Sequence, residues 1–175
     1  IGGLAGSIGS NGYLLTAEGE AATLGAATEC KNFGAVNIKG VDRETSTVTH
    51  IGGLTGHLYT ATLAKCENSG KITVDSPNIM ILFCGGLIGK GESAFATTAA
   101  ELKITDLKNT GDIELTSLVT RTLAIGGVGG YITGSYYDCQ RAVNEGNISS
   151  AATISATGSY LQIGGIIGRS GMYLT

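Results

Sequence analysis

The side chains best suited to chemistry in this chain are two histidines and four cysteines. His50 and His57 stand on either side of the segment 51–56. Their spacing does not fit the H-E-x-x-H pattern of zinc proteases, and no serine or cysteine nucleophile motif lies beside them. We therefore expect two ordinary, partly exposed histidines with no catalytic role.

The cysteines also lack a metal-binding pattern. They are Cys30, Cys66, Cys84 and Cys139, and no two of them form a C-x₂₋₄-C pair. Two of them occupy equivalent places in a repeated phrase, where Leu107 and Ala142 stand in later copies. A position that accepts Cys, Leu and Ala is typical of a buried apolar slot. A disulfide is the weaker alternative, and we predict no metal and no cofactor.

Other patterns that could support catalysis are absent from the sequence. The acidic residues are scattered, whereas polysaccharide-cleaving enzymes use paired carboxylates. No calcium-loop pattern is present, and the glycines of 125–130 lack the spacing of a dinucleotide loop. The threonines of 45–49 have no counterparts in other repeats, so they do not predict an ice-binding array. We expect that the chain is not an enzyme.

The residues between the two histidines form a glycine-rich phrase that occurs five times in the sequence. The copies read IGGLAG, IGGLTG, CGGLIG, IGGVGG and IGGIIG, and they begin at residues 1, 51, 84, 125 and 163. The intervals are 50, 33, 41 and 38 residues. Intervals of this size indicate a solenoid, a propeller or an array, in which each unit buries its apolar side chains against its neighbours.

A second phrase, Asn-x-Gly-x-(Val/Ile), lies between the glycine phrases. Its asparagines and glycines are Asn32, Asn68, Asn109, Asn144, Gly34, Gly70, Gly111 and Gly146. If the units stack as parallel coils, the asparagines lie above one another and form a ladder of amide hydrogen bonds. The glycine two residues later is expected to supply a turn position with positive φ.

The spacing between the two phrases divides each unit into two arcs. From asparagine to the next glycine phrase the distances are 20, 17, 17 and 20 residues, whereas the other arc varies between 16 and 30. Nearly constant spacing indicates a packed wall, and variable spacing indicates surface loops. The segments are rich in β-branched residues, which favours strands. Residues 93–103 are the one plausible helix, and they fall in a variable arc.

Composition limits the classes of protein that fit. The chain of 175 residues has 29 glycines, 14% charged residues and a net charge of −3. It lacks a basic footprint for nucleic acid, and its longest apolar run is too short for a membrane span. The first residue lies inside a repeat, so we expect a single repeat domain over 1–175 that is a fragment of a longer protein.

The pairing of the two phrases resembles the glycine-rich GLUG repeat of bacterial surface and secreted proteins. That repeat occurs in adhesin-like proteins and beside immunoglobulin-cleaving peptidases. The resemblance covers the whole chain and implies a parallel β-solenoid without catalytic residues. It is weaker in the fourth unit, where Gly129 and Ala142 depart from the pattern. We expect an all-β parallel β-helix of four to five repeats; a β-propeller is the alternative fold.

Tyrosines give the only hint of a ligand site. Six of the seven lie in variable arcs or beyond the last phrase, and four of them are expected to contact a sugar or a protein: Tyr13, Tyr59, Tyr136 and Tyr137. The simpler interpretation is that they cover the edges of the solenoid wall.

We therefore expect a non-enzymatic, extracellular or cell-surface repeat protein that acts as an adhesin-like stalk or a binding module. Its partner would be a host glycan or a host protein surface. Two alternatives remain open. The chain is a self-stacking subunit of an extracellular filament, because open strand edges at the ends of a coil invite further pairing. Alternatively, it is an accessory domain of a secreted peptidase or polysaccharide-active enzyme.

Overall fold

The computed structural model describes residues 1–9, 25–40, 42–93, 102–134, 137–154 and 160–171. These residues form β-strands and no helix. The pairings between strands are parallel and join successive repeats, so the expected β-solenoid is confirmed and the propeller alternative is wrong. Most of the expected helix, 94–101, lies outside the described residues, and the two residues after it begin a strand.

Two parallel sheets, named after their first strands, meet at the glycine phrases. The β1 sheet contains, in spatial order, β1 (Ala5–Gly9), β6 (Thr55–Tyr59), β11 (Ile88–Glu92), β15 (Gly129–Thr133) and β20 (Ile167–Gly171). The β5 sheet contains β5 (Asp42–Gly52), β10 (Asn78–Gly85), β14 (Leu118–Gly126), β18 (Thr153–Ile154) and β19 (Tyr160–Gly164).

Two further parallel sheets meet at the Asn-x-Gly phrases. The β2 sheet contains β2 (Gly25–Thr28), β3 (Lys31–Asn32), β7 (Ala61–Ala64), β8 (Glu67–Asn68), β12 (Leu102–Asn109) and β16 (Tyr137–Asn144). The β4 sheet contains β4 (Val36–Lys39), β9 (Ile72–Asp75), β13 (Ile113–Leu115) and β17 (Ile148–Ser150). The chain passes four times through the four sheets, and β20 begins a fifth pass.

Successive repeats stack in register. Gly85 pairs with Gly52 on one side and with Gly126 on the other, so the glycine phrases lie directly above one another. In the first repeat, Arg43 and Val48 pair with Ile79 and Ile81, which gives β5 three extra residues. This insertion accounts for the asparagine-to-glycine spacing of 20 residues in the first repeat, against 17 in each of the next two.

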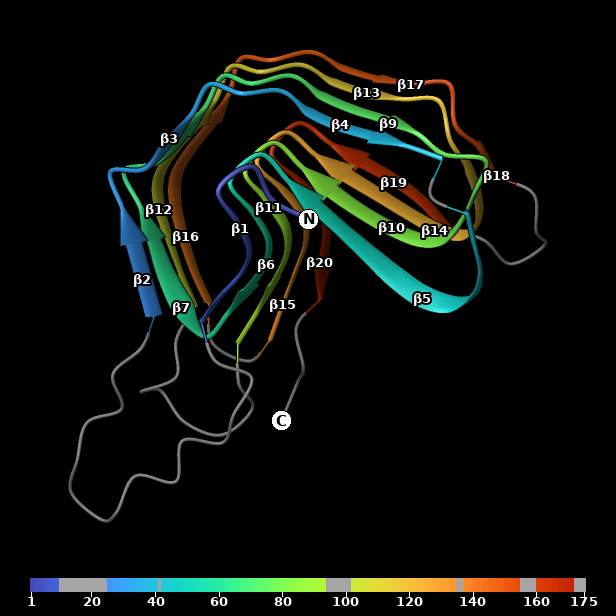
Figure 1. The fold of residues 1–175 in the computed structure, drawn as a ribbon. Helices are drawn as coiled ribbons and strands as arrows, with labels where there is room; N and C mark the ends of the chain where they lie inside the picture. Colours follow the sequence, from blue (N-terminus) through green and yellow to red (C-terminus); the bar gives the residue numbers. More distant parts are fainter. Residues whose placement is uncertain (10–24, 41, 94–101, 135–136, 155–159, 172–175) are drawn as a thin grey trace.

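The coil has two arms that meet at an angle (Figure 1). One arm encloses an apolar core between the β1 and β2 sheets, which includes Leu58 and Leu107. The other encloses a separate core between the β4 and β5 sheets, which includes Ile72 and Leu123. Removal of the apolar side chains of these two cores from water is the main contribution to the stability of the fold.

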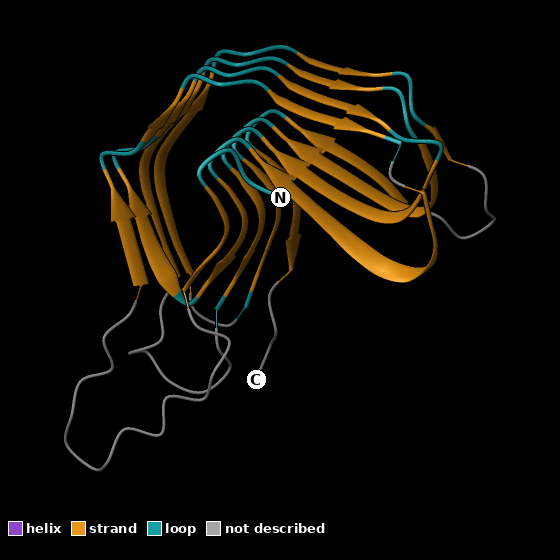
Figure 2. Ribbon diagram, viewed as in Figure 1, coloured by secondary structure: helices purple, strands orange, loops and turns teal. Residues whose placement is uncertain are grey.

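Loops occur at equivalent places in every repeat and form the corners of the coil (Figure 2). We call the Asn-x-Gly segments between the β2 and β4 sheets the outer corner, and the glycine phrases between the β5 and β1 sheets the inner corner. At the inner corner the chain bends at Gly53 and Leu54. Ile51 before the bend is buried in one core, and Leu54 after it is buried in the other. At each glycine phrase, the chain therefore passes from the core between the β4 and β5 sheets to the core between the β1 and β2 sheets.

Candidate functional site

The outer corner contains a continuous row of side-chain hydrogen bonds. Asn32 Nδ2 donates to Asn68 Oδ1 at 2.8 Å, Asn68 Nδ2 to Asn109 Oδ1 at 2.9 Å, and Asn109 Nδ2 to Asn144 Oδ1 at 2.8 Å. Each Nδ2 also donates to the carbonyl oxygen of the glycine two residues later. The row joins all four repeats, and Asn68 and Asn109 are fully buried.

The glycines of the outer corner serve a purpose different from the expected one. Gly34, Gly70, Gly111 and Gly146 do not have positive φ, so that expectation is wrong. A Cβ at Gly70 would lie 2.0 Å from the Gly34 carbonyl oxygen, and one at Gly111 would lie 2.2 Å from that of Gly70. Glycine is required because the backbones of successive repeats approach too closely for any side chain.

The outer corner packs directly on the inner corner. A Cβ at Gly53 would lie 2.4 Å from Asn68 Cγ, and one at Gly86 would lie 2.4 Å from Asn109 Cγ. The second glycine of each of the first four phrases thus makes room for the asparagine of the same repeat. This contact separates the two cores and explains why the two phrases occur together.

Positive φ occurs instead at charged residues beside the outer corner. Glu29, Lys65, Asp106 and Arg141 occupy the same position in four successive repeats, with φ between 51° and 56°. Their charges alternate along the stack. Lys65 Nζ lies 3.5 Å from Glu29 Oε1, and Arg141 Nε lies 2.5 Å from Asp106 Oδ1. Arg141 lowers the pKa of the Asp106 carboxyl.

A second column of charges, with the opposite signs, borders the asparagine row: Lys31, Glu67 and Lys108 precede the asparagine in register, and Glu145 follows it. Lys31 Nζ lies 3.3 Å from Glu67 Oε2, and Lys108 Nζ lies 2.9 Å from Glu145 Oε2. Glu145 raises the pKa of Lys108. The two columns form a checkerboard in which each charge has an opposite charge in a neighbouring repeat. Such exposed pairs specify register more than they stabilise the fold.

The inner corner has side chains of another kind. The residue just before each glycine phrase and the residue just after it belong to neither core, although their strand neighbours Ile51 and Leu58 do. In the second to fifth phrases these residues are His50, His57, Phe83, Lys90, Ala124, Tyr131, Gln162 and Arg169. Together with Tyr59 and Glu92 they form the inner-corner cluster.

Aromatic rings connect this cluster along the stack. The ring centroids of His50 and His57 are 5.2 Å apart, and His50 stacks on Phe83 at 5.7 Å. Phe83 in turn lies 4.9 Å from Tyr131. The Arg169 guanidinium carbon lies 5.0 Å from the centroid of the Tyr131 ring, which is a cation–π contact.

The charges of the inner-corner cluster do not balance. Lys90 Nζ pairs with Glu92 Oε2 at 2.5 Å. Burial lowers the pKa of His50 to about 4 and also lowers that of His57, so both are neutral at neutral pH. In the described part of the chain, Arg169 has no carboxylate within ion-pair distance. The cluster therefore carries one excess positive charge in a chain of net charge −3.

Several polar atoms of the cluster lack a protein partner. His50 Nε2, His57 Nε2 and Gln162 Oε1 are covered by neighbouring atoms and accept or donate no hydrogen bond to a described residue. Glu92 Oε2 approaches His57 Nε2 only to 3.6 Å, which is beyond hydrogen-bond distance. Buried polar atoms without partners are uncommon in native proteins and point to a water molecule or a ligand.

The four tyrosines expected to contact a ligand have different positions. Tyr13 and Tyr136 lie outside the described residues. Tyr59 belongs to the inner-corner cluster, where its ring contacts His57 edge to face at 5.8 Å. Tyr137 packs against the core between the β1 and β2 sheets, and its hydroxyl lies 2.7 Å from Ser170 Oγ. Tyr137 thus packs at the edge of a core, and its expected contact with a ligand stays a prediction.

The cysteines are unpaired and face the cores. Cys66 and Cys84 are buried, and burial raises the pKa of the Cys84 thiol to about 12. The slot of Cys30 and Cys66 holds Leu107 in the next repeat, which is also buried. It is the apolar slot expected from the sequence.

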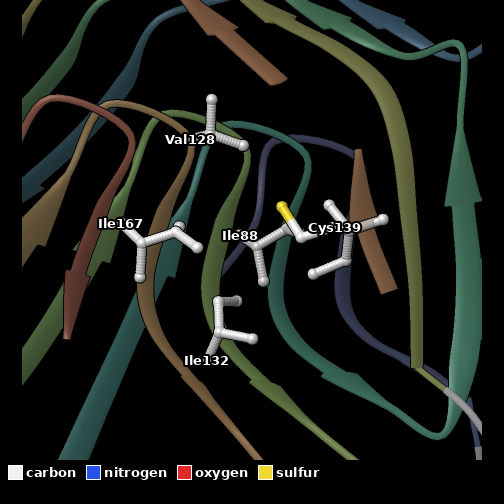
Figure 3. Close-up of a pocket in the computed structure, with 7 residues that line it drawn as sticks. Ile88, Val128, Ile132, Cys139 and Ile167 are labelled. Carbon is white, nitrogen blue, oxygen red and sulfur yellow. The ribbon is translucent and has the colours of Figure 1, made fainter. Parts of the chain in front are cut away.

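Within the described residues, an apolar gap lies at the core between the β1 and β2 sheets (Figure 3). Ile88, Val128, Ile132, Cys139 and Ile167 are among the side chains that line it. It has no room for a water molecule and no polar lining, so it is a small packing defect and not a ligand site.

Sequence reasoning missed the inner-corner cluster. The residues next to each glycine phrase occupy equivalent positions in the repeats but differ in residue type. Only their positions, and not their types, could have identified the cluster. His50 and His57 flank one phrase, and the aromatic and basic residues in the same two places of other phrases are their neighbours. Reading the flanking positions down the stack would have brought them together.

Comparisons with protein-family models, with curated proteins and with solved structures find no match for this chain. The resemblance to the GLUG repeat therefore stays a prediction. No helix in the described residues is long and apolar enough to cross a membrane.

Proposed function

We propose that the chain is a non-enzymatic recognition segment of an extracellular or cell-surface repeat protein of the adhesin type. One observation carries this proposal: the inner-corner cluster lines up aromatic and basic side chains from successive repeats outside both cores. Tyrosine and arginine are the residue types enriched at binding hot spots. Phe83 and Ala124 of the cluster are buried, whereas Tyr131 and Arg169 stay partly exposed and can reach a ligand.

The two corners have different parts in such a module. The outer corner holds the repeats in register through the asparagine row and the checkerboard of charges. The inner corner presents side chains whose types differ from repeat to repeat. A regular scaffold with one variable face is the usual arrangement of solenoid binding proteins.

Binding of the immobilised chain to arrays of glycans and of extracellular host proteins tests this proposal. The expected result is saturable binding that a Tyr59→Ala variant weakens, while a Tyr137→Ala variant that is still folded does not. Absence of binding to every member of both arrays would count against a recognition role and favour a stalk.

A further inference from the structure

We infer that the inner-corner cluster binds an acidic glycan, a linear sugar chain with carboxylate groups, that lies along the solenoid axis. This inference rests on the proposed recognition function and names the ligand class of the same site.

Recognition at the inner corner has to use side chains. The strands on both sides of the cluster pair in parallel through their backbones, from β5 to β10 and from β6 to β11. Between these strands no free edge is left, so a peptide cannot add a strand within the cluster. Among the described strands, one free edge of the β1 sheet is at β20, which carries Arg169 at the end of the cluster. The ligand must be read by imidazole, phenol, amide and guanidinium groups.

The cluster is elongated along the axis. His57, Lys90, Tyr131 and Arg169 occupy the same position in four adjacent strands of the β1 sheet. Adjacent strands lie about 4.8 Å apart, so these side chains span about 14 Å. A ligand that contacts all of them is an extended chain of several units, and not a single small molecule.

The charge of the cluster selects an anion. Arg169 lies over the Tyr131 ring and, within the described residues, is not neutralised by a carboxylate. The planar fork of a guanidinium matches a carboxylate through two parallel hydrogen bonds. The pairing of Lys90 with Glu92 leaves Arg169 as the anion-binding group of the cluster.

The remaining polar groups fit hydroxyls. The imidazoles of His50 and His57 and the amide of Gln162 combine donors and acceptors, and their Nε2 and Oε1 atoms lack protein partners. Sugar hydroxyls both donate and accept, so small rotations of these side chains would satisfy them. The aromatic rings between them offer apolar surface to sugar C–H groups.

Calorimetric titration of the purified 175-residue chain tests the inference with three probes. They are a short oligogalacturonate, the same oligosaccharide with methyl-esterified carboxylates, and an oligoglutamate peptide of equal charge. The variant is Arg169→Gln, and Arg141→Gln is its matched control because it removes the same charge from the outer corner. Thermal unfolding of both variants verifies that they are folded.

We expect oligogalacturonate to bind and its esterified form to bind at least about tenfold more weakly, as loss of a charge-assisted contact predicts. Arg169→Gln should weaken binding by about tenfold, and Arg141→Gln should leave it unchanged. An equal loss in both variants would mean that net charge alone attracts the ligand, which overturns the site.

The other outcomes separate this inference from the proposed function. If oligoglutamate binds as tightly with the same dependence on Arg169, the glycan class is wrong but recognition at the inner corner stands. If none of the probes binds while the arrays find another ligand, the inference fails alone. If neither the probes nor the arrays bind, both fail.

Discussion

The two corners of the coil use their polar side chains in different ways. At the outer corner the asparagine amides bond to one another and to backbone carbonyls, and the exposed charges pair across repeats. At the inner corner, ring nitrogens and an amide oxygen lack partners, and Arg169 lacks a counter-charge among the described residues. The polar side chains of the outer corner are paired within the protein, whereas the inner corner has polar groups without a partner among the described residues.

The two corners also differ in the sequence changes that they tolerate from repeat to repeat. A buried asparagine row loses hydrogen bonds on both sides when one member changes, so every repeat needs the same residue. The inner-corner side chains lie outside the cores, so their types differ from His50 to Phe83 to Ala124 without disturbing the stack. The identity of the asparagines along the stack indicates a supporting role, and the change from imidazole to phenyl to methyl at the inner corner indicates that the stack does not depend on one residue type there.

Gly86→Ala should have the largest effect, because it breaks the contact between the corners. The added Cβ would lie 2.1 Å from the Gly127 carbonyl oxygen and 2.4 Å from Asn109 Cγ. We expect a loss of more than about 4 kcal/mol in the free energy of unfolding, or no folding. Urea unfolding followed by circular dichroism measures it. Gly165→Ala is the control: this glycine stands in the equivalent place of the fifth phrase, with nothing within 4 Å of its Cβ.

Asn109→Ala should have the next largest effect. Asn109 is fully buried, accepts from Asn68 Nδ2, and donates to Asn144 Oδ1 and to the Gly111 carbonyl. Its removal leaves these groups unsatisfied, which costs about 3 kcal/mol. The inner-corner control is His57→Ala, which should cost less than about 1.5 kcal/mol because its ring nitrogen has no hydrogen bond to lose. Equal losses in the two variants would contradict the division between the corners.

Much of this architecture could be predicted because the repeats encode it. The intervals between glycine phrases predict stacked coils, and the constant place of asparagine predicts a ladder. The conformation of individual residues could not be predicted. Glu29 and Lys65 are not typical of positive φ, and they adopt it because the strands on both sides are fixed by pairing in the sheet.

The inner-corner cluster could not be predicted from residue types, because it depends on the angle between the arms. His50 and His57 are close only because the glycine phrase turns the chain between two sheets. Phe83 and Tyr131 join them only because the repeats stack in register. Along the linear sequence, each of these residues has different neighbours.

Lowering the pH should weaken the inner corner before the outer corner. The pKa of folded His50 is about 4, below its ordinary value of 6.5, so the unfolded chain binds a proton that the folded chain does not. The contribution of His50 to the free energy of unfolding is therefore fully present above pH 6.5, and it decreases as the pH is lowered toward 4. We expect a loss of about 1 kcal/mol, reduced by the partial exposure of the ring. Urea midpoints measured across this range should depend less on pH in His50→Gln.

The outer corner provides the comparison for this pH dependence. The pKa of Asp106 is lowered from 3.8, first through its hydrogen bond with Arg141, so its contribution is present above pH 3.8 and is lost only below it. Asp106→Asn should therefore leave the dependence between pH 4 and 6.5 unchanged. If His50→Gln and the parent chain have the same dependence in that range, His50 is not its source; a double variant that also carries His57→Gln then tests the other inner-corner histidine, whose pKa is lowered as well.

Reversal of one charge in the checkerboard should have the smallest effect. Arg141→Glu places a second carboxylate beside that of Asp106, which the native arginine holds through two hydrogen bonds. Because both side chains are exposed, water and salt screen the repulsion. Only a slight decrease of the urea midpoint is therefore expected at low salt, and none at high salt.

The double variant Arg141→Glu with Asp106→Arg should recover only part of the midpoint: it places opposite charges at the two positions again, but arginine at 106 then repels Lys65 of the preceding repeat, which acts electrostatically on this position. Arginine already adopts positive φ at the equivalent position of the next repeat, so the exchange adds no new backbone conformation. Ligand binding at the inner corner should be unchanged in the single and in the double variant. A change in binding would mean that the two corners are coupled through the stack and do not act separately.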